Sequence, residues 1–137
     1  MTQPVTTHIL LADDDNEDHE LFKEFLAKQA PDIDVVSVWN GQEALSYLAS
    51  CPDYMLPHVI ILDYKMPILN GPEVLDRLAR EPRYAAIPRI VWSTSNQQEY
   101  IDVCLKKGAS FFFTKPNTPA ELTGITEKAL SFCHRSI

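Results

Sequence analysis

The sequence predicts an α/β fold built on an open, doubly wound sheet of five parallel strands. Five short apolar runs alternate along the chain with five longer segments whose apolar residues recur at helical spacing. This alternation is typical of consecutive strand–helix units with right-handed crossovers, which place helices on both faces of one sheet. With five strands an open sheet is favoured over a barrel, and the strand order 2-1-3-4-5 is expected.

The expected strands are short and mostly lack the alternation of a half-exposed strand. Such continuous apolar runs indicate parallel strands that are covered on both faces, in the flavodoxin-like arrangement with five helices. We expect one domain over residues 1–137, with its core at about 8–132, because a chain of this length supports one compact unit. The runs lie at residues 9–12, 35–38, 59–62, 90–92 and 111–113.

The expected helices each carry one apolar stripe, and several have recognisable ends. Asn40 and Asn70 each precede a glycine and can cap a helix. Pro72 fits a first helical turn, and Gly108 fits the position just after a helix. The stripes lie within residues 21–26, 44–48, 74–78, 101–105 and 122–132.

The charge of the chain excludes two classes of partner. Twelve Lys and Arg against 19 Asp and Glu leave a net charge of −7. Nucleic-acid binding needs a basic patch that displaces counterions, and anionic membranes attract basic segments, so we expect neither nucleic acid nor membrane as a partner. Much of the surplus lies in residues 13–20, which carry six carboxylates and no Lys or Arg.

The remaining composition predicts a cytoplasmic protein. The chain shows no signal peptide or apolar run of membrane-spanning length, and three widely spaced cysteines read as reduced thiols. The histidines have no ligand spacing, so we expect them at the surface or at edges. They are His8, His19, His58 and His134.

Polar residues follow four of the expected strands at the edge where sites of doubly wound sheets lie. Asp13-Asp14-Asp15 follows the first strand, Asp63 the third, Ser93 the fourth and Lys115 the fifth. Converging carboxylates repel one another unless a cation neutralises them, and oxygen ligands favour Mg²⁺. With a lysine and a hydroxyl beside them, they form the parts of a phosphoryl-transfer site, and Asp63 is the candidate nucleophile.

At these residues the sequence resembles the receiver domain of two-component response regulators, over about residues 8–132. The resemblance rests on ordered segments: ILLADDD, ILDYKMPILNG (the D-x-x-M-P-x-x-x-G pattern), IVWSTS and FFFTKP, with WNGQEAL opening the second helix. It implies that Asp63 accepts a phosphoryl group from a histidine kinase or a histidine phosphotransfer protein. It also implies Mg²⁺ bound by Asp13, Asp14, Asp63 and the backbone carbonyl of Lys65, without an organic cofactor.

The same resemblance assigns the switching residues. Lys115 would pair with the phosphoryl oxygens, and its peptide bond to Pro116 would be cis, as in the family. Ser93 would shift to donate a hydrogen bond to the phosphoryl group, and Phe112 would swing inward. A plain core role for Phe112 is the open alternative.

Two residues near the expected acceptor predict slow self-dephosphorylation. Lys65, two residues after Asp63, places a long cationic side chain where the attacking water must approach. Thr94 stands where the family usually has a smaller residue and could narrow the same path.

The expected function is therefore a stand-alone, phosphorylation-dependent signalling switch rather than an enzyme. Its output would be a protein–protein contact near the fifth strand and its flanking helices, or a step in a phosphorelay, with a homodimer as an open alternative. Two alternatives are a phosphorylation-independent scaffold and a Mg²⁺-dependent aspartyl phosphatase. Four further acidic residues are expected to be capping or solvated: Asp15, Glu17, Asp18 and Glu20.

Overall fold

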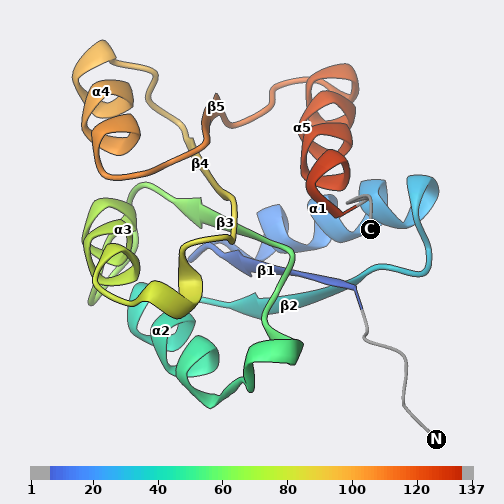
Figure 1. The fold of residues 1–137 in the computed structure, drawn as a ribbon. Helices are drawn as coiled ribbons and strands as arrows, with labels where there is room; N and C mark the ends of the chain where they lie inside the picture. The colour runs from blue at the N-terminus through green and yellow to red at the C-terminus, as the bar shows by residue number, and fades with distance from the viewer. Residues whose placement is uncertain (1–6, 134–137) are drawn as a thin grey trace, which may run out of the picture.

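The computed structural model describes residues 7–133 and confirms the predicted fold. One sheet of five parallel strands has the order β2-β1-β3-β4-β5, as Figure 1 shows. The order is the expected one, with β1 between β2 and β3. The strands are β1 His8–Ala12, β2 Asp34–Val38, β3 Val59–Asp63, β4 Arg89–Ser93 and β5 Phe111–Thr114.

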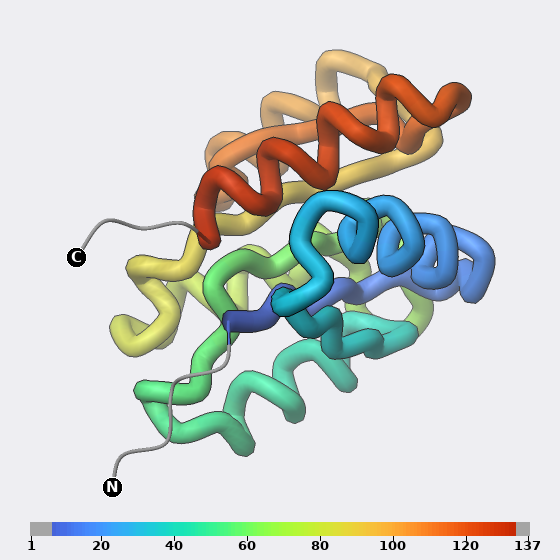
Figure 2. The backbone as a smooth tube through the Cα atoms, turned by 90° about the vertical axis from the view of Figure 1, so that its right-hand side faces the viewer, coloured from blue at the N-terminus to red at the C-terminus, as the bar shows by residue number. Residues whose placement is uncertain are grey.

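Helices cover both faces of the sheet. In Figures 1 and 2, α1 and α5 lie together on one face, and α2, α3 and α4 lie on the other. Two single turns of 3₁₀ helix, η1 and η2, lie in the connections before β3 and β4. The helical segments are α1 Asn16–Gln29, α2 Gly41–Ser50, η1 Asp53–Met55, α3 Gly71–Ala79, η2 Pro82–Tyr84, α4 Gln98–Lys106 and α5 Pro119–Cys133.

The core has two layers, one on each face of the sheet. Successive residues of β1 alternate between them: Leu10 joins the layer under α2, α3 and α4, whereas Leu11 joins the layer under α1 and α5. Both side chains are fully buried. Burying a leucine stabilises a fold by about 1.5–3 kcal/mol, so the central strands are firmly held and the positions of their ends are fixed.

The predicted helix ends are confirmed. The side chain of Asn40 accepts a hydrogen bond from the Glu43 amide, and Asn70 forms a reciprocal capping box with Glu73. Gly108 follows α4 with a φ of 104°, a left-handed conformation that glycine adopts without steric cost. These local signals therefore set the lengths of the helices as the sequence predicts.

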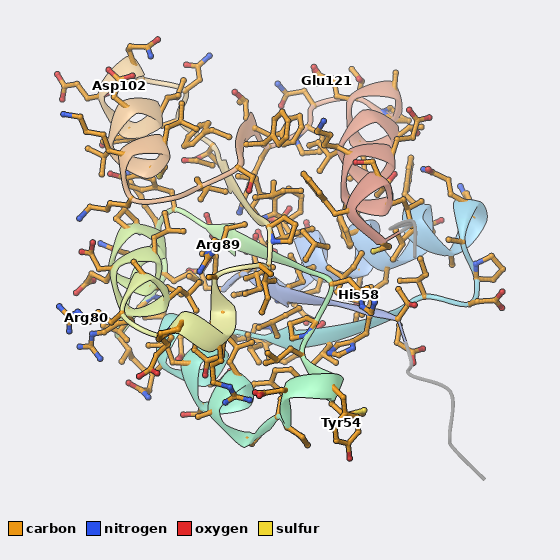
Figure 3. The ribbon with its side chains drawn as sticks, in the orientation of Figure 1. Tyr54, His58, Arg80, Arg89, Asp102 and Glu121 are labelled. Carbon is orange, nitrogen blue, oxygen red and sulfur yellow. The ribbon has the colours of Figure 1, made fainter. Side chains whose placement is uncertain are left out.

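Strand register brings the expected polar residues to one edge. Ala12 pairs with Leu62, so the residues that follow them, Asp13 and Asp63, emerge side by side. In the side-chain view of Figure 3, Asp102 on α4 and Glu121 on α5 point away from the sheet, and both are exposed. Asp13 and Asp63 at the sheet edge are thus buried, unlike these two surface carboxylates.

Two further results concern the whole described range. The prediction of a cis bond between Lys115 and Pro116 is wrong, because residues 7–133 contain no cis peptide bond. Even before proline the trans form is favoured by about 0.5–1 kcal/mol, so a trans bond needs no special support. No helix in the described residues is long and apolar enough to cross a membrane.

Candidate functional site

Three aspartates converge at the carboxyl edge of the sheet, as predicted. One carboxylate oxygen from each of Asp13, Asp14 and Asp63 lies within 4.8 Å of the others. Asp13 is fully buried and Asp63 is 4% exposed, whereas Asp14 is open to solvent. Asp13 Oδ1 also accepts a hydrogen bond of 2.8 Å from the Asp15 amide, which fixes the turn into α1.

Lys115 reaches this cluster from the end of β5. Its Nζ lies 3.0 Å from Asp13 Oδ2 and 3.2 Å from Asp63 Oδ2. The third and shortest ion pair, 2.7 Å, joins Nζ to Asp18 Oδ2 in the first turn of α1. The prediction that Asp18 is only a capping or solvated residue is therefore wrong, because the orientation of α1 brings its carboxylate to the lysine.

Burial and charge repulsion shift the pKa values of the two buried carboxyl groups. Burial, followed by the negative charge of Asp13, raises the pKa of Asp63 to about 7, although Lys115 opposes the shift. Burial likewise raises the pKa of Asp13. Burial alone would lower the pKa of Lys115, but its ion pairs with Asp18 and Asp13 raise it overall. The site therefore holds a charged ammonium beside two carboxyl groups whose pKa values are raised.

Hydrogen bonds hold the main chain around Asp63 in place. The Lys65 amide points to Asp63 Oδ1 at 3.4 Å, and the Gly71 amide donates to the Tyr64 carbonyl at 2.9 Å. On the neighbouring strand, buried Ser93 accepts a hydrogen bond of 3.1 Å at Oγ from the Ser95 amide. The Ser93 hydroxyl thus lies at the same strand edge as the carboxylates.

The other predicted residues surround this centre. Phe112 is half-buried and packs against the core layer under α2, α3 and α4. Lys65 is exposed, and its Nζ lies 6.0 Å from the centre of the Tyr100 ring. Tyr100 in turn stacks on Tyr64 with ring centres 4.5 Å apart. Aromatic side chains therefore border the acceptor segment on the side of α4.

One histidine supports the site although sequence reasoning placed the histidines at the surface. His19 is 2% exposed, and its Nε2 lies 2.8 Å from the backbone carbonyl of Asp13. Its spacing from Phe22 and Leu26, two buried residues of α1, was the signal that it faces the core. His8 is also buried, against the expectation, while His134 lies outside the described residues.

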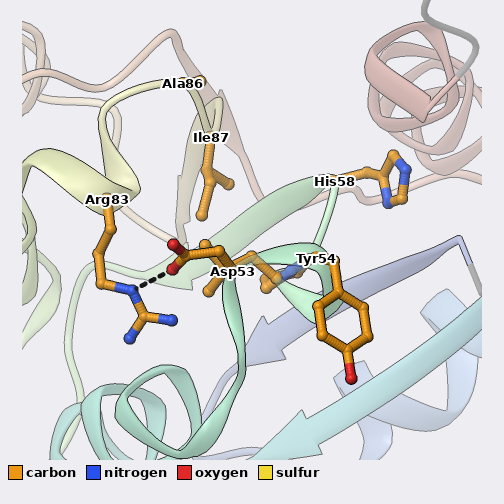
Figure 4. Close-up of a pocket in the computed structure, with 8 residues that line it drawn as sticks. Asp53, Tyr54, His58, Arg83, Ala86 and Ile87 are labelled. Atoms are coloured by element: carbon orange, nitrogen blue, oxygen red, sulfur yellow. Dashed lines mark hydrogen bonds and ion pairs between the residues drawn. The ribbon is translucent and has the colours of Figure 1, made fainter. Parts of the chain in front are cut away.

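A separate cavity of about 380 Å³ lies between the segments around η1 and η2 (Figure 4). Two charged residues that line it, Arg83 and Asp53, pair with each other, because Arg83 Nε donates to Asp53 Oδ1 at 2.9 Å. Arg83 also donates to the carbonyl of Cys51, so it braces these loops. The cavity does not include the polar residues of the sheet edge, and we assign the chemistry to the acidic cluster.

The donor set at the sheet edge fits a hard divalent cation. Mg²⁺ prefers oxygen ligands, and it is commonly held by one or two carboxylates together with retained waters. Buried Asp13 and Asp63 with exposed Asp14 offer such oxygens beside an opening to solvent. Within the described residues, no other group of three or more acidic, cysteine or histidine side chains lies close enough to bind a metal.

Comparison with known proteins accounts for this combination of fold and site. The family model of the response regulator receiver domain matches residues 9–127. The chain belongs to this family. The chain is therefore a receiver domain of the two-component type, which is consistent with a phosphorylation-dependent signalling switch.

Relatives extend this likeness over most of the receiver. Two-component response regulator ORR5 of Oryza sativa subsp. japonica is 31% identical over 123 residues, which are 90% of this chain and 88% of that protein. The phosphorylated cyanobacterial phytochrome response regulator RcpA is 30% identical, with a TM-score of 0.82 and 94% of each chain covered. The Mn²⁺-bound form of response regulator Rcp1, at 24% identity and a TM-score of 0.80, covers 96% of this chain and 97% of its own, and bears on the fold alone.

Proposed function

We propose that Asp63 is the phosphoacceptor of this receiver and takes a phosphoryl group from the phosphohistidine of a histidine kinase or histidine phosphotransfer protein. The observation that carries the proposal is the 3.2 Å ion pair between Asp63 Oδ2 and Lys115 Nζ inside the acidic cluster. RcpA, which is 30% identical, has a phosphorylated form, and this supports the same chemistry here.

In the proposed transfer, a carboxylate oxygen of Asp63 forms a bond to phosphorus while the bond from phosphorus to the donor's imidazole nitrogen breaks. The imidazole keeps the electron pair of that bond, and the product is an acyl phosphate. Lys115 supplies fixed positive charge to the phosphoryl oxygens. Because its Nζ is already in contact with Asp63, it needs little rearrangement to do so.

We also propose a Mg²⁺ site made by Asp13, Asp14 and Asp63, with the backbone carbonyl of Lys65 as a further ligand. When bound, Mg²⁺ neutralises charge on the phosphoryl oxygens and on the carboxylates themselves. The Asp15 amide and the His19 ring hold Asp13 from two sides, which keeps its side chain oriented toward this position.

The proposed switch passes through Ser93 and Phe112. The Ser93 hydroxyl would leave the Ser95 amide and donate to the phosphoryl group. Ser93 pairs with Thr114 of β5, and Phe112 lies two residues before Thr114 on the same strand. A shift of Ser93 therefore bears directly on the strand that carries Phe112, and the phosphoryl group selects the arrangement that binds it better.

Output through a protein contact fits the surface around β5. Leu105 on α4 and Phe111 on β5 expose 48% and 37% of their surface, and β5 is an edge strand. We propose that a downstream protein, or a second copy of the chain, binds there. We further propose a cytoplasmic location, since none of the three cysteines in the described residues forms a disulfide.

The alternatives to a switch have less support. A phosphorylation-independent scaffold would not need Asp13 and Asp63 in contact with Lys115, yet both carboxylates form ion pairs with it. A phosphatase with an aspartyl nucleophile usually has a second acid two residues later, where this chain has Lys65. We therefore propose that the chain turns over only its own acyl phosphate.

The test is incubation with acetyl phosphate and Mg²⁺, followed by intact mass measurement. Wild type should gain one phosphoryl group, and Asp63→Asn should gain none. Asp102→Asn, which changes an exposed aspartate of α4, should behave as wild type. No added phosphate on wild type, or equal addition to Asp63→Asn, would refute the assignment.

A further inference from the structure

Lys115 is shared among three carboxylates, and the shortest contact is with the residue outside every sequence motif. Its Nζ lies 2.7 Å from Asp18, 3.0 Å from Asp13 and 3.2 Å from Asp63. The Lys115 side chain is only 13% exposed and that of Asp18 only 23%, so this pair is well shielded. Lys115 Nζ donates hydrogen bonds to Asp18 and Asp63, and it forms an ion pair with Asp13.

Asp18 holds the lysine from a rigid support. It lies in the first turn of α1, where Asp15 caps the helix by accepting from the Glu17 amide. The buried residues Phe22 and Leu26 fix the same helix against the sheet. The Asp18 carboxylate therefore has a defined place, 97 residues away in sequence from the lysine that it binds.

The two other partners of Lys115 are the carboxylates that the proposed function assigns to Mg²⁺. A lysine that bonded only Asp13 and Asp63 would neutralise them and compete directly with the cation. A third carboxylate, that of Asp18 on α1, takes part of the ammonium's positive charge. Mg²⁺ then meets carboxylates that keep more of their negative charge.

We propose that Asp18 is a positioning residue that anchors Lys115 toward α1 and thereby leaves Asp13 and Asp63 able to bind Mg²⁺. This inference rests on the proposed function, since it concerns the same site.

A matched control separates anchoring from ordinary helix electrostatics. Any carboxylate in the first turn of a helix is favourable toward the helix dipole and adds negative charge near the site. Glu17 is the neighbouring acid of that turn and is exposed. Glu17→Gln therefore removes the same charge from the same turn without removing the ion pair at 2.7 Å between Asp18 and Lys115.

The first measurement is Mg²⁺ binding to the unphosphorylated protein, followed by tryptophan fluorescence. Trp92 is a reporter, because its ring centre lies 5.5 Å from Lys115 Nζ. Asp18→Asn should weaken Mg²⁺ binding about fivefold, in the range expected for loss of one partly shielded ion pair. Glu17→Gln should change it by less than about twofold, and Asp18→Glu should recover part of the loss. Equal effects of Asp18→Asn and Glu17→Gln would overturn the proposal.

A double-mutant cycle tests whether the effect passes through the lysine. In a Lys115→Met background, Asp18→Asn should weaken Mg²⁺ binding no more than Glu17→Gln does. A fivefold loss that persists without Lys115 would overturn the proposal, because Asp18 would then act on the cation by itself. Thermal melting of each variant in chelator establishes that the proteins compared are folded.

Phosphorylation by acetyl phosphate gives the second readout. Asp18→Asn should raise the Mg²⁺ concentration for half-maximal rate about fivefold and leave the rate at saturating Mg²⁺ within about twofold of wild type. A fall in the saturated rate with unchanged Mg²⁺ dependence would overturn the anchoring role. If wild type accepts no phosphate at all, the proposed function fails, whereas the fluorescence titration still decides the role of Asp18.

Discussion

Gly71 lies against the main chain of Asp63 so closely that a Cβ at position 71 would be 2.8 Å from the Asp63 carbonyl oxygen. The same Cβ would be 3.2 Å from the Cα of Tyr64. Gly71 is also the first residue of α3, and its amide donates to the Tyr64 carbonyl. The start of α3 therefore sets the position of the acceptor segment, and any side chain there must displace it.

Gly71→Ala should destabilise the protein and weaken Mg²⁺ binding, because the added methyl group meets backbone atoms that cannot turn aside. We expect a loss of about 1–3 kcal/mol, as for other overpacked positions, which urea unfolding would measure. Gly124→Ala is the matched control. Apart from its chain neighbours and the nearby backbone of α5, no described atom lies within 4 Å of the added Cβ at this exposed position, so it should stabilise the protein by up to about 1 kcal/mol. Equal stabilities of the two variants would contradict the close approach at Gly71.

The backbone of Ile68 predicts a stabilising substitution. Ile68 is the one non-glycine residue with positive φ in residues 7–133, at 71°, and it is 72% exposed. A left-handed conformation costs about 1–2 kcal/mol for an ordinary residue and suits asparagine or glycine better. Ile68→Asn should therefore raise the melting temperature by a few degrees.

Ile68→Ala separates backbone strain from the loss of an exposed apolar side chain. Alanine removes most of the side chain but keeps the steric cost at Cβ, so Ile68→Ala should gain less than Ile68→Asn in the same melting experiment. If alanine and asparagine stabilise equally, the strain at this φ is not the cause.

The arrangement of the edge residues could be predicted because it depends on local signals and topology. The apolar runs and the caps at Asn40 and Asn70 indicate the elements, and parallel strands must end at a common edge. Asp13, Asp63, Ser93 and Lys115 therefore meet as soon as the strand order is right.

The role of Asp18 could not be predicted in the same way. First-turn acids commonly serve the helix dipole, and nothing local distinguishes Asp18 from Glu17. Its contact with Lys115 depends on how α1 packs against the sheet, which no local pattern around Asp18 indicates. The Pro116 isomer depends on a similarly small local preference, so tertiary context decides it.

The raised pKa of Asp63 predicts a pH-dependent stability in the absence of metal. The pKa is about 7 in the folded protein against 3.8 for an unperturbed aspartate. Between these values the folded state holds more protons than the unfolded state, so the free energy of unfolding falls as pH rises toward about 7. Asp63→Asn has no carboxyl to titrate at this position, so its stability should not fall in this way. In chelator, the difference between its melting temperature and that of wild type should therefore rise in favour of Asp63→Asn from about pH 5 to about pH 8.

Two controls belong to this experiment. Asp102→Asn should follow the wild-type curve across the same pH range, since that aspartate is exposed. Mg²⁺ should stabilise wild type at about pH 8 and have much less effect on Asp63→Asn, because binding to the folded state alone raises stability. Parallel pH curves for wild type and Asp63→Asn would show that the Asp63 carboxyl does not titrate as described.

Lys65 predicts slow loss of the phosphoryl group. Its exposed side chain follows the acceptor by two residues, and its Nζ lies 6.0 Å from the centre of the Tyr100 ring, so we expect it to hinder the approach of water to Asp63. We expect the labelled phosphoprotein in Mg²⁺ to lose phosphate with a half-life of minutes or longer, and Lys65→Asn to shorten that half-life several-fold by opening the route. Lys106→Asn, which changes an exposed lysine in the last turn of α4, should leave it unchanged. A wild-type half-life of seconds, with little change in Lys65→Asn, would show that this side chain does not protect the acyl phosphate.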